Sequence, residues 1–138
     1  MRPDRFQRLL LDAAATIPGV TAKALADTGY SRHPYGIAVE AAGKTTRWQA
    51  VSVAPGDNYT QPERDPILGE RLPGREVPAV TDDPATVEQA LVAALINADP
   101  GEFSAVDLYS ERPEPPAVRY GAAFELHSSA KVYLQAIR

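Results

Sequence analysis

The sequence of 138 residues contains no cysteine. This absence excludes disulfide bonds, thiolate nucleophiles and zinc sites built on cysteine. Histidine is nearly as scarce, because His33 and His127 are the only two. Metal chemistry is therefore thinly supplied, and we expect no resident metal, no cofactor and no complete set of catalytic residues.

Long apolar runs and basic clusters are absent as well. Runs such as residues 90–96 are far too short to span a bilayer. Asp4, Arg5 and Arg8 interrupt the apolar core that a secretory signal needs. The 14 basic residues are scattered and outnumbered by 18 acidic ones, whereas nucleic-acid binding needs a concentrated basic surface. We expect a cytoplasmic protein that binds neither nucleic acid nor membrane.

The overall composition is that of an ordinary folded protein. Hydrophobic residues make up 44% of the chain and charged residues 23%, close to the usual values for globular domains. A chain of this length buries about two thirds of the surface that its unfolded form exposes. We therefore expect one domain over residues 1–138. The excess of arginine over lysine and the abundant alanine are common in bacteria with GC-rich genomes.

Two amphipathic helices are predicted. Apolar residues recur at three- and four-residue spacing over residues 3–17, and Pro18 and Gly19 end that pattern. Asp83 can cap a second helix that begins at Pro84, where the missing N–H of proline costs nothing. Pro100 ends this second helix. Its predicted apolar stripe comprises Val87, Leu91, Ala94, Leu95 and Ala98.

Strand patterns follow each helix. Residues 20–27 form a weak candidate and residues 103–109 a better one. Two similar stretches then read as β-hairpins: YGIAVEAAGKTTRW, which begins at Tyr35, and YGAAFELHSSAKVY, which begins at Tyr120.

Placing each hairpin turn fixes a predicted register. A turn at Gly43 and Lys44 pairs Val39 with Trp48, and a turn at Ser128 and Ser129 pairs Phe124 with Tyr133. Strand alternation then puts these four paired side chains on one apolar face, beneath the helices. The two hairpins superimpose residue for residue in this scheme.

The predicted fold class is α+β, with an antiparallel sheet of about six strands and two helices on one face. A helix, a strand and a hairpin occur in this order over residues 3–54 and again over residues 84–138, which indicates an internal repeat. In topology alone this arrangement resembles the helix-and-sheet folds of bacterial secretion chaperones and related small adaptor proteins. The resemblance is at the level of the fold and implies no specific activity.

The connection between the halves, residues 55–83, is rich in proline, glycine and charge. Such a composition forbids a long helix or a central strand, and long connections without regular structure are usually functional or disordered. Apolar residues at Ile67, Leu68, Leu72, Val77 and Val80 suggest that parts of it pack on the domain. We refer to residues 55–83 as the arm and consider it a candidate contact element; the alternative is a crossover without a function of its own.

Two glutamates at matching hairpin positions, Glu40 and Glu125, are candidates for chemistry. In the predicted register Glu40 faces Arg47, which favours a structural cross-strand ion pair. Glu125 faces Val132 instead and shares its face with His127, and a carboxylate beside an imidazole can transfer protons or bind a metal. No third member accompanies them. His33 precedes Pro34 and is expected in a surface loop.

The sheet face opposite the helices is the predicted interaction surface. It carries small residues at Gly36, Ala38, Gly121 and Ala123, which let another layer approach closely. The predicted surface comprises Gly36, Ala38, Gly121, Ala123, Glu125 and His127 on the sheet, with Ile67, Leu68 and Leu72 on the arm.

The leading functional hypothesis is a non-enzymatic interaction module that binds another protein or a second copy of itself. An adaptor, a chaperone, an immunity protein or a phage or mobile-element assembly protein would fit this description. The alternative is a small metal- or ligand-dependent enzyme or binding protein with its site near Glu125 and His127. A virion or assembly subunit that forms oligomers is a third possibility.

Overall fold

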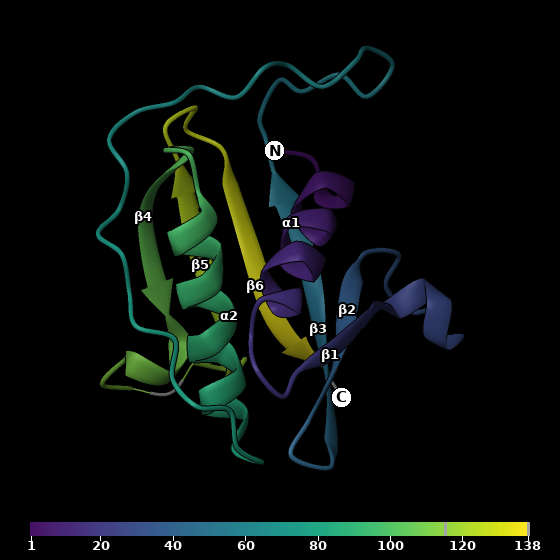
Figure 1. Ribbon diagram of the computed structural model, residues 1–138. Coiled ribbons are helices and arrows are strands. Elements are labelled where there is room, and N and C mark those ends of the chain that lie inside the picture. The colour runs from purple at the N-terminus through teal and green to yellow at the C-terminus, as the bar shows by residue number, and fades with distance from the viewer. Residues whose placement is uncertain (115, 138) are drawn as a thin grey trace.

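The computed structural model describes residues 1–114 and 116–137. Its centre is one antiparallel sheet of six strands in the order β1-β2-β3-β6-β5-β4, and both helices lie on the same face of this sheet (Figure 1). The predicted α+β class is therefore confirmed. The strands are β1 (Thr21–Ala24), β2 (Gly36–Ala41), β3 (Lys44–Val53), β4 (Phe103–Leu108), β5 (Gly121–Leu126) and β6 (Lys131–Ile137).

Both helices begin where their sequence signals predict. Helix α1 (Pro3–Ala15) has proline in its first turn and ends two residues before Ile17, the predicted end. Helix α2 (Pro84–Ala98) is capped by Asp83, whose side chain accepts a hydrogen bond from the N–H of Ala85 at 3.0 Å. In the described part of the chain, neither helix combines the length and apolar character needed to cross a membrane.

The core lies between the helices and the sheet. Trp48, Ile37 and Val39 of the first hairpin are fully or almost fully buried, as predicted. Phe124 lies at the centre, with its ring centroid 4.7 Å from that of Phe103 and 6.1 Å from that of Phe6. Each such side chain contributes about 1.5–3 kcal/mol on burial. The aromatic contacts therefore tie α1 to strands of the opposite half.

The two halves of the chain contain the same succession of elements. Each half has a helix, a strand, a short 3-10 turn and a hairpin, and strands β3 and β6 join the halves at the centre of the sheet. The 3-10 turns are η1 (Leu25–Thr28) and η2 (Tyr109–Glu111). Common descent of the halves from one ancestral unit stays a hypothesis.

The register predicted for the first hairpin is wrong by two residues. The turn consists of Ala42 and Gly43, both with positive φ, and Lys44 is already the first residue of β3. Glu40 therefore faces Thr45, while Arg47 faces Ala38, so the predicted ion pair between Glu40 and Arg47 does not form across the strands. A shift of two residues keeps every side chain on its predicted face.

The register predicted for the second hairpin is wrong by one residue, which has a larger effect. Its loop has three residues, His127 to Ser129, because Leu126 and Ala130 are still joined by a backbone hydrogen bond and Ser129 adopts a positive φ of 70°. Phe124 consequently faces Val132. A one-residue shift turns a strand over, so Val132 is buried while Tyr133, predicted in the core, lies on the opposite face. The two hairpins do not superimpose residue for residue.

Candidate contact surface at the arm

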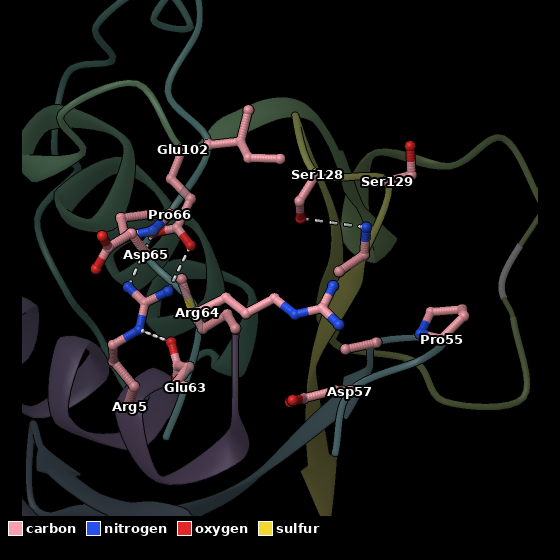
Figure 2. Close-up of a pocket in the computed structure, with 14 residues that line it drawn as sticks. Arg5, Pro55, Asp57, Glu63, Arg64, Asp65, Pro66, Glu102, Ser128 and Ser129 are labelled. Atoms are coloured by element: carbon pink, nitrogen blue, oxygen red, sulfur yellow. Dashed lines mark hydrogen bonds and ion pairs between the residues drawn. The ribbon is translucent and has the colours of Figure 1, made fainter. Parts of the chain in front are cut away.

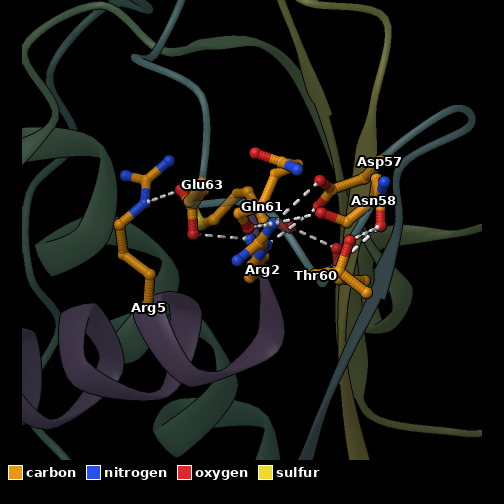
Figure 3. Close-up of polar contacts among 9 residues, drawn as sticks. Arg2, Arg5, Asp57, Asn58, Thr60, Gln61 and Glu63 are labelled. Carbon is orange, nitrogen blue, oxygen red and sulfur yellow. Dashed lines mark hydrogen bonds and ion pairs between the residues drawn. The ribbon is translucent and has the colours of Figure 1, made fainter.

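The arm is fastened to the start of α1 by two arginines. The Arg2 guanidinium donates to both carboxylate oxygens of Asp57, at 3.1 and 3.2 Å (Figure 3). Arg5 donates to Glu63 of the arm and, through its two terminal nitrogens, to Glu102 of the body. Glu102 is almost fully buried, so Arg5 neutralises a buried carboxylate and holds the arm with its remaining N–H group.

These contacts also set the ionisation of the groups involved. Hydrogen bonding to Glu102, and then to Glu63, raises the pKa of Arg5 against the opposing effect of its partial burial. The hydrogen bond from Arg2 lowers the pKa of Asp57. Both shifts favour the charged forms of Arg5 and Asp57, which the ion pairs of the fastening require.

A second fastening lies further along the arm. The N–H of Gly69 donates to the carbonyl of Gly101 at 2.8 Å, and Nε2 of His127 lies 3.0 Å from the carbonyl oxygen of Glu70. A Cβ at Gly69 would lie 2.6 Å from the imidazole of His127, so a larger residue there would require this ring to move.

The rest of the arm covers the outer side of α2. The side chain of Asn97 accepts from the N–H of Arg75 at 2.8 Å and donates to its carbonyl at 2.7 Å. Leu72, Val77 and Val80 pack against the core. Helix α2 is consequently buried on more than its predicted stripe, although Ala98, predicted in that stripe, is exposed. Its buried residues include Val92, Ala93 and Ile96. The prediction that parts of the arm pack on the domain is confirmed for Leu72, Val77 and Val80, and it is wrong for Ile67 and Leu68, which are exposed.

A hollow of about 240 Å³ lies between the first half of the arm and the ends of β3 and β6 (Figure 2). Arg64 extends across it toward Ser128 and Pro55, and no ion pair or hydrogen bond joins its guanidinium to the other residues drawn there (Figure 2). Much of the wall is apolar, formed by Met1, Ala54, Pro55, Pro66, Ile67 and Ala130.

Most of the large apolar side chains that remain exposed lie on the arm or at the end of β3, and Ile67 is the one among them that lines the hollow. Tyr59, Ile67 and Leu68 are 63%, 57% and 55% exposed, and Val53 at the end of β3 is 48% exposed. Tyr35, at 36%, is the other one among the described residues. Ile67 and Leu68 were predicted contact residues and lie on the surface, whereas Leu72 is partly covered because it packs on the core.

The small residues of the predicted sheet surface are less accessible than strand alternation suggested. Gly36, Ala38 and Gly121 are buried, and Ala123 is partly buried. A Cβ at Gly36 would lie 2.6 Å from Leu25 of η1, so the 3-10 turn covers the sheet at that position. These positions offer a partner little surface, and Ala123 offers the most.

Glu125 and His127, the candidate chemical pair, each contact another group. Lys131 lies opposite Glu125, with its Nζ 3.8 Å from a carboxylate oxygen, and His127 contacts the arm. The predicted contrast is thus reversed, since Glu125 and not Glu40 has the basic cross-strand partner. Among the described residues, no group of three or more potential metal ligands occurs. His33 lies in the loop before β2, half-buried and stacked against Tyr30.

Glu88 is a buried carboxylate that the sequence reasoning missed. It lies on α2 and accepts hydrogen bonds from the N–H of Gly121 at 2.8 Å, from the N–H of Ser110 at 3.1 Å and from the Ser110 hydroxyl. Burial raises the pKa of Glu88, and the hydrogen bonds from Gly121 and Ser110 oppose this effect. Gln7 on α1 accepts from the N–H of Gly36 at 3.0 Å in the same way. A polar residue inside an apolar helical stripe was the available signal.

Comparison of the chain with protein-family models, with curated proteins and with solved structures gave no match.

Proposed function

We propose that the protein is a non-enzymatic interaction module whose main contact surface is the end of the molecule formed by the arm. The observation that carries this proposal is the exposure of Tyr59, Ile67 and Leu68 on the arm and of Val53 at the adjoining end of β3, while most other large apolar side chains are buried. Aromatic and apolar side chains in such clusters are typical of the energetic centres of protein interfaces. A cytoplasmic adaptor, chaperone, immunity or phage assembly protein would use such a surface.

The way the arm is held supports this function. Arg2 and Arg5 bind it on one side of the exposed residues, and Gly69 and Glu70 bind on the other side. Ile67 and Leu68 are therefore presented on a segment that is fixed at both ends. A surface ordered before binding loses less conformational entropy when a partner docks.

The edges of the sheet favour contact through a surface over the addition of a partner strand. Edge strand β1 has only four residues and carries Lys23. Edge strand β4 contains a register shift between Phe103 and Ala105, and its Asp107 is held in an ion pair by Arg112. Short strands, bulges and charges are the features that discourage strand pairing at a sheet edge.

The test compares partner capture by variants with matched polarity changes. Ile67→Ser combined with Leu68→Ser removes the exposed apolar pair, and Tyr35→Ser is the control at the other exposed position. Ala123→Arg tests the sheet face. We expect a protein from cells that encode this chain to bind the wild type and both single variants, and not the double variant.

Light scattering on the purified protein shows in parallel whether that partner is a second copy. Equal capture by the wild type and the double variant, at equal thermal stability, would refute the arm as the contact surface. Loss of capture only with Ala123→Arg would move the surface to the sheet.

A further inference from the structure

We propose that the hollow beside Arg64 accepts an apolar side chain from an acidic segment of another protein, and that an Asp or Glu next to that side chain pairs with Arg64. This inference rests on the proposed interaction function and specifies its partner. It draws on the size of the hollow, on the charge of its lining and on the position of the arm.

The size of the hollow favours a single side chain as its occupant. Sites for drug-sized molecules usually measure about 300–1,000 Å³, and an engineered cavity of about 150 Å³ holds one benzene ring. At about 240 Å³ this hollow lies between the two. Its apolar wall and the exposed Ile67 beside it suit an aliphatic or aromatic anchor residue, which is the usual centre of a protein interface.

The charge of the lining favours a negative group beside that anchor. Three of the four carboxylates that line the hollow are already bound, Asp57 by Arg2 and two others by Arg5. The fourth, Asp65, is exposed on the arm next to Arg64. Asp65 forms no ion pair with the described residues. The Arg64 guanidinium likewise forms none, and it is the charge that extends across the hollow (Figure 2). It lies close enough to Asp57 to contribute to the lowered pKa of that carboxyl.

The loop between β5 and β6 supplies further donors at the same place. Ser128 and Ser129 line the hollow on the side toward which Arg64 extends (Figure 2). The Ser128 hydroxyl accepts one long hydrogen bond from the N–H of Ala130, at 3.5 Å, and its own hydrogen can turn toward a ligand. A guanidinium beside two hydroxyls can bind a carboxylate through several donors.

A carboxylate in the middle of a peptide fits this site better than a C-terminal one. Proteins that capture a C-terminal carboxylate use nests of backbone N–H groups, and the donors here are side chains on two separate segments. An acidic residue within an extended segment also lets the peptide continue past the hollow along Ile67 and Leu68, which are exposed.

The experiment is a titration followed by amide NMR shifts, with four small peptides as probes. Three are acetylated and amidated, with the sequences Ala-Leu-Asp-Ala, Ala-Leu-Asn-Ala and Ala-Leu-Lys-Ala, and the fourth is acetyl-Ala-Leu with a free carboxylate. We expect millimolar binding of the Asp peptide that shifts the amides of Ala54, Ile67 and Ser129. Binding of the Asn peptide is expected to be about two- to five-fold weaker, as for loss of an exposed ion pair, and the Lys peptide weaker still.

Charge-matched variants assign the effect to one residue. Arg64→Gln should remove the preference for Asp over Asn, whereas Arg32→Gln, at an exposed loop position away from the hollow, should preserve it. Both side chains are exposed, so both variants are expected to fold. Equal binding of the Asp and Lys peptides, tighter binding of the free carboxylate, or shifts confined to the outer sheet would overturn the proposal.

The two proposals fail in different ways. If the Ile67→Ser and Leu68→Ser variant loses its native partner while Arg64→Gln keeps full affinity for that partner, the acidic occupant is wrong and the interaction function stands. If neither variant changes binding of the native partner, the proposed interaction function at the arm is wrong, and the occupant inferred from it is wrong as well.

Discussion

Replacing Glu88 with glutamine should leave the stability of the fold almost unchanged, whereas replacing it with alanine should lower that stability strongly. The carboxylate is fully buried and accepts hydrogen bonds from two backbone N–H groups, of Ser110 and Gly121, and from the Ser110 hydroxyl. Glutamine can keep the same arrangement: its carbonyl oxygen accepts from both N–H groups, and its amide donates to the hydroxyl. Gln7 makes the equivalent contact to Gly36 in the other half.

The expected loss of stability depends on how many hydrogen-bond donors each variant leaves without an acceptor. Alanine deprives the buried N–H of Gly121 and the partly buried N–H of Ser110 of their acceptor, at about 1–3 kcal/mol for each, and also leaves a cavity. We expect Glu88→Ala to lower the free energy of unfolding by about 3–5 kcal/mol. Glu88→Gln keeps all the contacts and should change it by less than about 1 kcal/mol.

The difference between glutamate and glutamine should depend on pH with a definite sign. The folded-state pKa of Glu88 lies above its ordinary value of 4.5 because the side chain is buried. The stability that the protonated form contributes is therefore fully present below the unfolded pKa and is lost as pH rises through the folded pKa. One group changes the free energy of unfolding by at most about 1.4 kcal/mol per pH unit. The stability of Glu88→Gln should thus increase relative to that of the wild type as pH rises from about 4.

The assay is urea unfolding followed by the fluorescence of Trp48, which is the only tryptophan and is fully buried. Wild type, Glu88→Gln and Glu88→Ala are compared between about pH 4 and pH 8. Other titrating groups, such as Asp57, act equally in all three proteins and cancel in the differences. Equal losses for Gln and Ala would refute the hydrogen-bond argument. A Gln variant whose stability falls relative to that of the wild type as pH rises would refute the raised pKa.

Two further predictions concern the backbone and the arginine fastening. Gly121 has φ 149°, and a Cβ there would lie 2.1 Å from a carbonyl oxygen of β6. Gly121→Ala should therefore lower the free energy of unfolding by more than about 3 kcal/mol, measured by urea unfolding. Gly43→Ala is strained but lies in open space, so it should lower the same quantity by about 1–2 kcal/mol. Arg5→Ala leaves the buried Glu102 unpaired, so it should lower the free energy of unfolding by about 2–4 kcal/mol and speed protease cleavage within residues 55–68. Arg75→Ala, which breaks an exposed ion pair, should lower the free energy of unfolding by less than about 1 kcal/mol. Equal losses of stability in the two variants would contradict the fastening.

Strand patterns predicted the class of the fold, and turn geometry decided where the prediction of register failed. Alternation identified the buried faces of β2, β3 and β5 correctly, because it depends only on each strand by itself. Register depends on the number of residues in the loop. Ala42 at φ 52° and Ser129 at φ 70° adopt conformations that their residue types rarely take. Ala42 was therefore not predicted as a turn residue, and Ser129 was placed in a two-residue turn although its loop also contains His127.

The contact surface was partly predictable for a similar reason. Exposed apolar residues in a proline-rich segment, such as Ile67 and Leu68, could be recognised from composition alone. The hollow could not, because it depends on Arg5 bridging residues that are 58 and 97 positions away in the chain. Contacts between segments so distant in sequence leave no local pattern.

The repeated Tyr-Gly of the two hairpins now has a physical explanation that does not require common descent. Gly36 and Gly121 both have φ near 150°, and a Cβ at either would strike a backbone carbonyl of the next strand. In both halves the carbonyl of the preceding tyrosine also accepts from that next strand, at 3.1 and 3.0 Å. Any chain that starts a hairpin beneath a 3-10 turn in this geometry requires glycine there. The glycine match therefore reflects a shared backbone constraint, and evidence for duplication has to come from positions that this geometry leaves free.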